Sequence, residues 1–178
     1  MSSLQFLKEA APIGGRGVKV GHGLAICTKK VTPVEVSDIA ISSSRIILVD
    51  TPALNPDGDV AINIVSYLGK WMRKATNANL KVAGLLYFHR ITDPRLNEKF
   101  TTHHDALRRM LPSDDKYKAL LVTTMWDDAY GDSEHYEDRE RELRDNWQRI
   151  GPSQSVVKFR KSQESAREVV RYLLTLNL

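Results

Sequence analysis

The sequence predicts an α/β domain built on a mostly parallel sheet with helices on both faces. Short apolar runs alternate with longer amphipathic stretches four times, and the connections between them are short. This alternation is typical of parallel strands joined by helices. The 178 residues are 42% hydrophobic and 27% charged, as expected for one globular domain with a buried core. We expect a single domain over residues 1–178, with an N-terminal helix and Gly-rich loop at 1–23 and the sheet core at 24–178.

The composition also narrows the classes of function. The net charge of +4 is mild, and basic residues alternate with acidic ones, so charge alone does not favour a nucleic-acid partner. The single cysteine, Cys27, cannot form an internal disulfide and indicates a reducing compartment. The longest apolar stretches, such as Val82–Phe88, are too short to span a bilayer. We expect a cytoplasmic protein without a membrane span.

A helix and a loop are predicted at the N-terminus. Ser2–Ala11 has a helical apolar face, and Pro12 ends it. Residues 13–23 hold five of the ten glycines and are expected to form a loop. A linker is favoured over a phosphate-binding loop, because no strand precedes these glycines and no Gly-Lys-Ser/Thr follows them into a helix.

A hairpin is predicted next. Val31–Ala40 alternates loosely and contains Pro33, which an edge strand tolerates. After a turn at Ser42–Ser44, the aliphatic run Ile46–Val49 has the length of a buried strand. The tight connection implies antiparallel pairing.

Three further strands alternate with helices in the rest of the chain. The strands are predicted at Lys81–Phe88, Tyr117–Thr124 and Ser155–Phe159. Apolar residues at steps of three and four predict helices at Ala61–Ala75, from Thr101 or Thr102, from Ser133, and over the last residues of the chain. In the charged helix from Ser133, the residues expected to be buried are Tyr136, Leu143, Trp147 and Ile150. In the last helix they are Ala166, Val169, Val170, Leu173 and Leu174.

Polar residues follow four of the predicted strands. They are Asp50-Thr51, His89-Arg90, Thr124–Asp127 and Lys161-Ser162. Open α/β sheets bind ligands beyond the carboxyl ends of their strands, so we predict a ligand site at this edge. A hydrolase that uses His89 is disfavoured, because no serine or cysteine nucleophile has an evident partner. The pair His103-His104 lacks the spacing of a helical metal site.

Several of these strings resemble motifs of the P-loop GTPases. Asp50-Thr51-Pro52-Ala53 resembles the Asp-x-x-Gly switch, whose aspartate holds Mg²⁺ through water, and Cys27-Thr28 resembles the switch threonine that also ligates Mg²⁺. Thr124-Met125-Trp126-Asp127 resembles the Asn-Lys-x-Asp guanine reader. The segment Phe159–Ala166 resembles the final base-contacting loop.

Together with the strings Leu-Val-Asp-Thr-Pro, Tyr-Phe-His-Arg-Ile-Thr-Asp and Leu-Val-Thr-Thr-Met-Trp-Asp, these motifs are similar to G-domain proteins abundant in filamentous fungi. That group is similar to the septin and immunity-associated GTPases, and the likeness runs from Val18 onward. It implies a three-layer P-loop NTPase fold that binds GTP or GDP with Mg²⁺. It also implies nucleotide-binding roles for Thr28, Asp50, Thr124, Asp127, Lys161 and Ser162, and Mg²⁺ ligation by Ser3, Thr28 and Asp50.

Three departures from the family pattern shape the expected function. Ala53 stands where the family has glycine, and Thr124 and Met125 replace its Asn and Lys. No Gly-x-x-x-x-Gly-Lys-Ser/Thr string occurs, and the chain starts as if cut just after that lysine, with Ser2 or Ser3 at the Mg²⁺-binding hydroxyl. The family's first, central strand would also be missing. The strands ending at Asp50 and containing Leu85 are then expected to pair directly or to leave a gap in the sheet.

Two functions follow from these departures. The first is a GTP-binding domain that keeps the guanine-reading edge, with hydrolysis weak or absent because the loop that holds the phosphates is missing. We assign no catalytic residue. The alternative is a nucleotide-independent pseudo-GTPase that serves as a protein-interaction or scaffold module, including a homo-oligomer. In that case the exposed helix Glu134–Arg149 would be the docking face.

Overall fold

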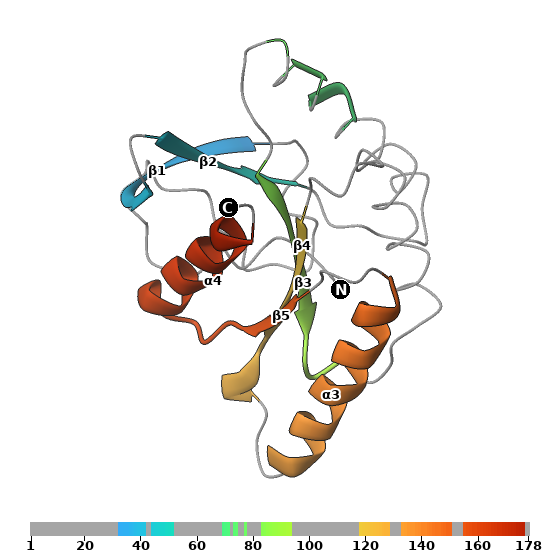
Figure 1. The fold of residues 1–178 in the computed structure, drawn as a ribbon. Coiled ribbons are helices and arrows are strands. Elements are labelled where there is room, and N and C mark those ends of the chain that lie inside the picture. Colours follow the sequence, from blue (N-terminus) through green and yellow to red (C-terminus); the bar gives the residue numbers. More distant parts are fainter. Residues whose placement is uncertain are drawn as a thin grey trace.

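The computed structural model describes residues 32–41, 44–51, 69–71, 73, 74, 77, 83–93, 118–128, 133–150 and 155–176. The strands are β1 (Thr32–Ile41), β2 (Ser44–Asp50), β3 (Gly84–Arg90), β4 (Lys118–Thr124) and β5 (Ser155–Lys158). The helices are α3 (Ser133–Ile150), α4 (Gln163–Thr175) and the short 3-10 helix η2 (Trp126–Asp128), as Figure 1 shows. Residues 69–71, 73 and 74 are helical, as predicted for Ala61–Ala75. The predicted N-terminal helix, the Gly-rich loop and the helix from Thr101 or Thr102 lie outside the described residues.

The predicted hairpin is confirmed. β1 pairs antiparallel with β2, and Thr32 lies opposite Asp50 at one end of the ladder. The register shifts between Val36 and Ile41, which marks a bulge or irregularity near the turn. The run of β-branched residues in β2 explains why this segment prefers an extended conformation.

The parallel sheet is smaller than the sequence predicts. It has three strands in the order β3-β4-β5, and both neighbouring pairs are parallel. The hairpin forms a separate two-stranded sheet, so β2 and β3 do not pair. We expected these two strands either to pair directly or to leave a gap in the sheet. The described residues show the second arrangement.

Helices cover both faces of the parallel sheet, as predicted. Side chains alternate between the faces of a strand, and this divides the apolar residues into two cores. One core joins the sheet to α4 and contains Leu86, Phe88, Leu120, Val122, Phe159, Ala166, Val169 and Leu173. The other joins it to α3 and contains Tyr87, Ile91, Ala119, Leu121, Leu143, Trp147 and Val156. Burial on both faces explains why β3 and β4 read as continuous apolar runs.

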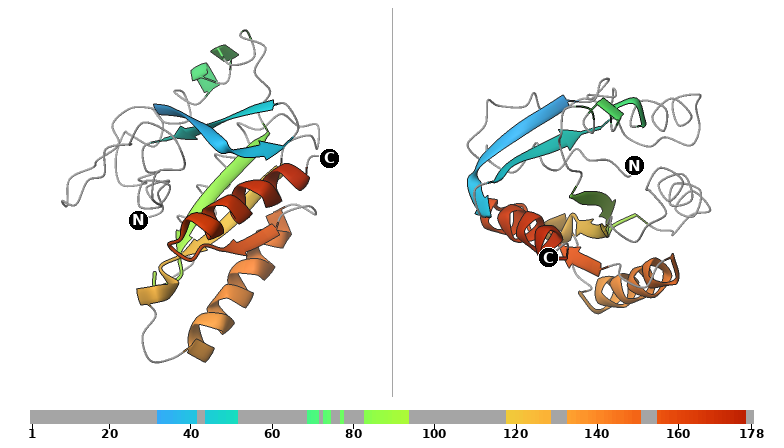
Figure 2. Two further views of the ribbon diagram at one scale, coloured as in Figure 1. Left: turned by 90° about the vertical axis from the view of Figure 1, so that its left-hand side faces the viewer. Right: turned by 45° about the horizontal axis from the view of Figure 1, so that its top comes forward.

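Helix α4 also contacts the hairpin. Its residue Val170 is buried with Ile46 and Leu48 of β2 and with Leu174 packed around it. Figure 2 shows α4 beside the hairpin and along one face of the parallel sheet. All five residues predicted to face inward on this helix lie in one of these clusters, with Leu174 only partly buried. Helix α4 is therefore the element that the two sheets share.

Within the described residues, neither α3 nor α4 combines the length and the apolar character that crossing a bilayer requires.

Candidate functional site

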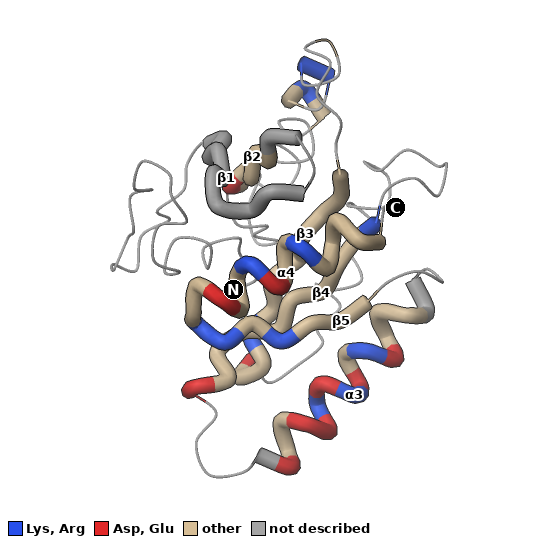
Figure 3. Tube along the Cα trace, turned by 60° about the vertical axis from the view of Figure 1, so that its left-hand side comes forward, with Lys and Arg blue, Asp and Glu red and all other residues tan. Residues whose placement is uncertain are grey.

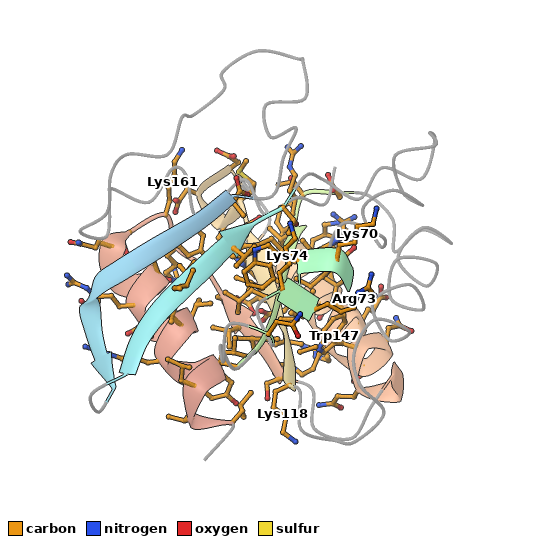
Figure 4. The ribbon with its side chains drawn as sticks, turned by 90° about the horizontal axis from the view of Figure 1, so that it is seen from above. Lys70, Arg73, Lys74, Lys118, Trp147 and Lys161 are labelled. Atoms are coloured by element: carbon orange, nitrogen blue, oxygen red, sulfur yellow. The ribbon has the colours of Figure 1, made fainter. Side chains whose placement is uncertain are left out.

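The segments that follow the three parallel strands are held together by backbone hydrogen bonds. The N–H of Ile91, just after β3, donates to the carbonyl of Thr124 at 2.9 Å. The N–H of Phe159, just after β5, donates to the carbonyl of Thr123 at 2.8 Å. Figure 4 shows Lys161, beyond β5, and Lys118, at the start of β4, at opposite ends of the molecule. The carboxyl edge of the sheet therefore gathers three of the four predicted polar segments, those at the ends of β3, β4 and β5. The fourth, Asp50-Thr51, ends β2, which belongs to the separate hairpin sheet.

The turn after β4 has an uncommon backbone conformation. Met125 has a φ of 62°, and it is the one described residue other than glycine with a positive φ. Such a conformation costs energy for a residue with a Cβ. The Met125 side chain packs against the core under α4, and the Asp128 N–H donates to its carbonyl at 3.3 Å. The turn therefore fixes the start of η2, where Asp127 and Asp128 are exposed.

Thr124 lies in the interior. It is fully buried, and its Oγ1 donates to the carbonyl of His89 at 3.2 Å. This bond links the ends of β3 and β4 below the turn. The resemblance assigns nucleotide binding to two residues of the string Thr124–Asp127. Asp127 lies at the surface, and Thr124 is buried beneath the turn.

Lys161 and Ser162 lie exposed at the start of α4. Ser162 is the N-cap of the helix, and its Oγ accepts from the Ser165 N–H at 3.1 Å. The Ser165 Oγ in turn accepts from the Arg160 N–H at 3.0 Å. The two serines thus fix the path of residues 160–165, so Lys161 leaves the sheet from an ordered loop.

Asp50 and Thr51 are buried at the end of β2. Asp50 is on the same face of β2 as Ile46 and Leu48 because side chains alternate along a strand, and that face packs on α4. Carboxylate and hydroxyl oxygens suit Mg²⁺, so the chemistry of the predicted ligands fits this ion. However, Ser3 and Thr28 lie outside the described residues, so the structure places only Asp50 of that set. The described residues hold no group of three or more His, Cys, Asp or Glu that could bind a metal ion.

The sequence prediction missed a buried carboxylate. Glu140 of α3 is 5% exposed, although most of that helix was expected to be solvated. Its Oε2 lies 3.3 Å from Lys158 Nζ, and its Oε1 accepts from Thr123 Oγ1 at 3.2 Å. The spacing held a signal, because Glu140 falls on the same helical stripe as Tyr136, Leu143 and Trp147.

Lys158 of β5 joins this carboxylate to the turn. Its ammonium group lies 2.7 Å from Glu137 Oε1 and 4.2 Å from the centre of the Trp126 ring. The Lys158 hydrogen bond is the main reason why the pKa of Glu137 lies below its usual value. Trp126 Nε1 donates to Thr123 Oγ1 at 3.1 Å. One lysine therefore contacts two acids of α3 and the aromatic residue next to Asp127.

His89 is buried and neutral at physiological pH. Burial lowers its pKa from 6.5 to about 4, a shift that Asp93 opposes and Arg139 reinforces. Arg139 also donates to the carbonyl of Ile91 at 2.9 Å, which ties α3 to the end of β3. The apolar run predicted as a strand, Lys81–Phe88, ends in His89 and Arg90, and these two residues are still part of β3, where they lie opposite Thr123 and Thr124 of β4. A buried, neutral imidazole fits the structural role that the sequence favoured.

Comparisons with protein-family models, curated proteins and solved structures find no match to this chain.

Proposed function

We propose that this chain is a guanine-nucleotide-binding domain similar to the P-loop GTPases, with a base-reading edge and with hydrolysis weak or absent. The observation that carries the proposal is the position of Asp127. Its carboxylate is exposed at the carboxyl edge of a parallel sheet, on a turn fixed by the unusual backbone of Met125. Ligands of α/β sheets bind at this edge, and strained backbone clusters at binding sites.

The chemistry of a carboxylate at this position favours guanine. Two carboxylate oxygens can accept hydrogen bonds from both the ring N–H and the exocyclic amine of guanine, a pair of donors that adenine does not present in that geometry. The ordered loop at Lys161 would border the base from the side of α4. Resemblance to the family assigns Mg²⁺ to Ser3, Thr28 and Asp50, and phosphate contacts are reduced because the sequence lacks the Gly-x-x-x-x-Gly-Lys-Ser/Thr string. Base recognition would then supply most of the specificity.

A titration series with three nucleotides tests the proposal. Fluorescently labelled guanosine, inosine and adenosine diphosphates are added to the protein with and without Mg²⁺. Inosine keeps the ring N–H but lacks the amine, so its affinity should fall between the other two. Because a hydrogen bond to a charged group contributes about 1.5–3 kcal/mol, guanine should bind at least about tenfold more tightly than adenine.

Asp127→Ala should remove the preference for guanine. Asp128→Ala is the matched control, because Asp128 is an exposed acid in the same turn, and it should leave the preference intact. Equal affinity for the three nucleotides, or a preference that survives Asp127→Ala, would contradict the proposal.

The second candidate is a module that binds a protein partner or a second copy of itself without nucleotide. It is favoured by the outer face of α3, which is mainly acidic, with Arg141 among five exposed carboxylates. Figure 3 shows the charged residues along this helix. The exposed residues are Glu134, His135, Glu137, Asp138, Arg141, Glu142, Asp145 and Gln148. Light scattering tests this candidate. A molar mass above that of one chain that does not change with nucleotide and that Arg141→Glu lowers would favour it.

A further inference from the structure

Four side chains from different elements meet behind the turn that carries Asp127. They are Glu140 from α3, Thr123 from β4, Lys158 from β5 and Trp126 from η2. Trp126 Nε1 donates to Thr123 Oγ1, and Thr123 Oγ1 donates to Glu140 Oε1. Lys158 contacts both the Glu140 carboxylate and the Trp126 ring, so the cluster connects α3 to Trp126 by two routes.

The burial of Glu140 shows what this cluster requires. A carboxylate withdrawn from water costs several kcal/mol unless it is paired and hydrogen-bonded. The side chain of Glu140 is 7% exposed, compared with 52% for Glu137 of the same helix, although both contact Lys158. Glu140 alone of the two also accepts from Thr123. Glu140 also lies 4.0 Å from Arg144 of the same helix, so its distinctive contact outside α3 is with the hydroxyl that receives the Trp126 indole N–H.

We propose that Glu140 is a positioning residue that orients the base-reading turn through Thr123 and Trp126. The inference rests on the proposed function, because it concerns how Asp127 is presented to guanine. The hydroxyl of Thr123 has one proton, and its contact with Glu140 at 3.2 Å is shorter than that with the Val157 carbonyl at 3.4 Å. The hydroxyl therefore donates its hydrogen bond to the Glu140 carboxylate. Its oxygen stays directed toward the Trp126 indole N–H, from which it accepts.

The strained backbone explains why the turn needs such support. Met125, with its φ of 62°, directly precedes Trp126. A residue in this region persists only where its surroundings over-determine the conformation. The packing of Met125 holds the start of the turn, and the cluster around Thr123 holds the ring that follows it. Without the second anchor, Asp127 would sample several orientations and lose its paired geometry toward the base.

The test combines a signal from Trp126 with nucleotide binding. The exchange of the Trp126 indole N–H with solvent is followed by NMR and assigned with Trp126→Phe. The indole signal of Trp147, which is buried beside Leu143, reports whether the core under α3 remains folded. Variants Glu140→Ala, Glu140→Gln and Thr123→Val are compared with Glu137→Ala, the control that removes the exposed partner of Lys158.

Glu140→Ala and Thr123→Val should each speed the exchange of the Trp126 indole and weaken guanine nucleotide binding by about tenfold, the value of one charge-assisted hydrogen bond. Binding of the adenine nucleotide should not change. Glu140→Gln retains an acceptor for Thr123 and should rescue most of both effects, and Glu137→Ala should match the parent protein. Thr123→Val decides the outcome if Glu140→Ala fails to fold.

The readouts separate this inference from the proposed function. If Asp127→Ala abolishes the guanine preference while Glu140→Ala and Thr123→Val leave both indole exchange and affinity unchanged, the positioning role is wrong and the proposed function stands. If the parent protein shows no guanine preference, the proposed function fails. Faster indole exchange in the two variants would then still support control of the turn by Glu140.

Discussion

The ammonium group of Lys158 lies 4.2 Å from the centre of the Trp126 ring. Cations at this distance from an indole face are attracted by its quadrupole, by about 0.5–2 kcal/mol. The same ammonium lies 3.3 Å from the buried carboxylate of Glu140. One side chain therefore stabilises both the acid in the interior and the aromatic residue of the turn.

Replacing Lys158 should destabilise the fold strongly. Lys158→Met removes the nearest cation of the buried Glu140 carboxylate and leaves Arg144, 4.0 Å away, as its remaining cation, so we expect a loss of up to roughly 3–5 kcal/mol in the free energy of unfolding. Adding Glu140→Gln to this variant should recover part of the loss, because it removes a buried charge that has lost its nearest cation. Urea unfolding of the two single variants and the double variant measures this coupling. Strictly additive effects would show that the pair does not interact.

Glycine at position 125 should be tolerated better than alanine. Both variants lose the packing of the Met125 side chain, but only glycine avoids the strain of a positive φ, worth about 1–2 kcal/mol. Met125→Gly should therefore be at least as stable as Met125→Ala, the reverse of the usual order. Thermal and urea unfolding of the two variants give the comparison. A clearly more stable alanine variant would contradict the positive φ.

The buried histidine should make stability depend on pH. The pKa of His89 falls from 6.5 to about 4 on folding, mainly through burial. Between these values the unfolded chain binds more protons than the folded protein, so acidification destabilises the fold. The contribution of the neutral imidazole is present above pH 6.5 and is lost as the pH falls to about 4. It amounts to roughly 3 kcal/mol.

Urea unfolding at several pH values between 7.5 and 4.5, chosen to cover that interval, measures the effect of His89. In His89→Gln this part of the pH dependence should be missing, so the curves of the variant and the parent should converge toward acid pH. His135→Gln removes an exposed histidine of α3 and should change stability by less than about 0.5 kcal/mol. Parallel curves for His89→Gln and the parent would argue against a neutral, buried imidazole.

Gly84 should not accept a side chain. A Cβ at this position would lie 2.6 Å from the Lys118 carbonyl oxygen and 2.8 Å from Leu173 Cδ1. Gly84→Ala should therefore push β3 away from β4 and cost about 1–3 kcal/mol of stability. Gly69, which is helical, provides the control, because its nearest atom would be Arg73 Nη1 at 3.9 Å. Gly69→Ala should be neutral or stabilise the fold by up to about 1 kcal/mol, as measured by urea unfolding.

Elements set by local pattern were predictable from the sequence. The aliphatic run of β2 and the helical stripe of α4 each show a periodicity that needs no knowledge of distant residues. The separation of β2 from β3 was left open, because the pairing of strands distant in sequence depends on the whole fold. The same holds for the end of β3, where pairing with Thr123 and Thr124 extends the strand through His89 and Arg90.

The candidate site was predicted in part for the same reason. The segments after β3, β4 and β5 meet because parallel strands share a carboxyl edge. Glu140 was missed because a charged residue on an apolar stripe becomes stable only with partners from other elements, here Lys158 and Thr123. Lys158 and Thr123 lie under α3 because of the order of the strands and the face of the sheet on which each side chain lies. Periodicity within one segment specifies neither.

The contact of α4 with both sheets bears on the order of events during synthesis. Its residues 163–175 come after every described strand in the chain, so Ile46 and Leu48 reach Val170 only after both sheets have left the ribosome. The apolar side of β2 must wait for a partner made much later. Nascent chains stalled before residue 163 should therefore depend most on chaperones that shield apolar strands.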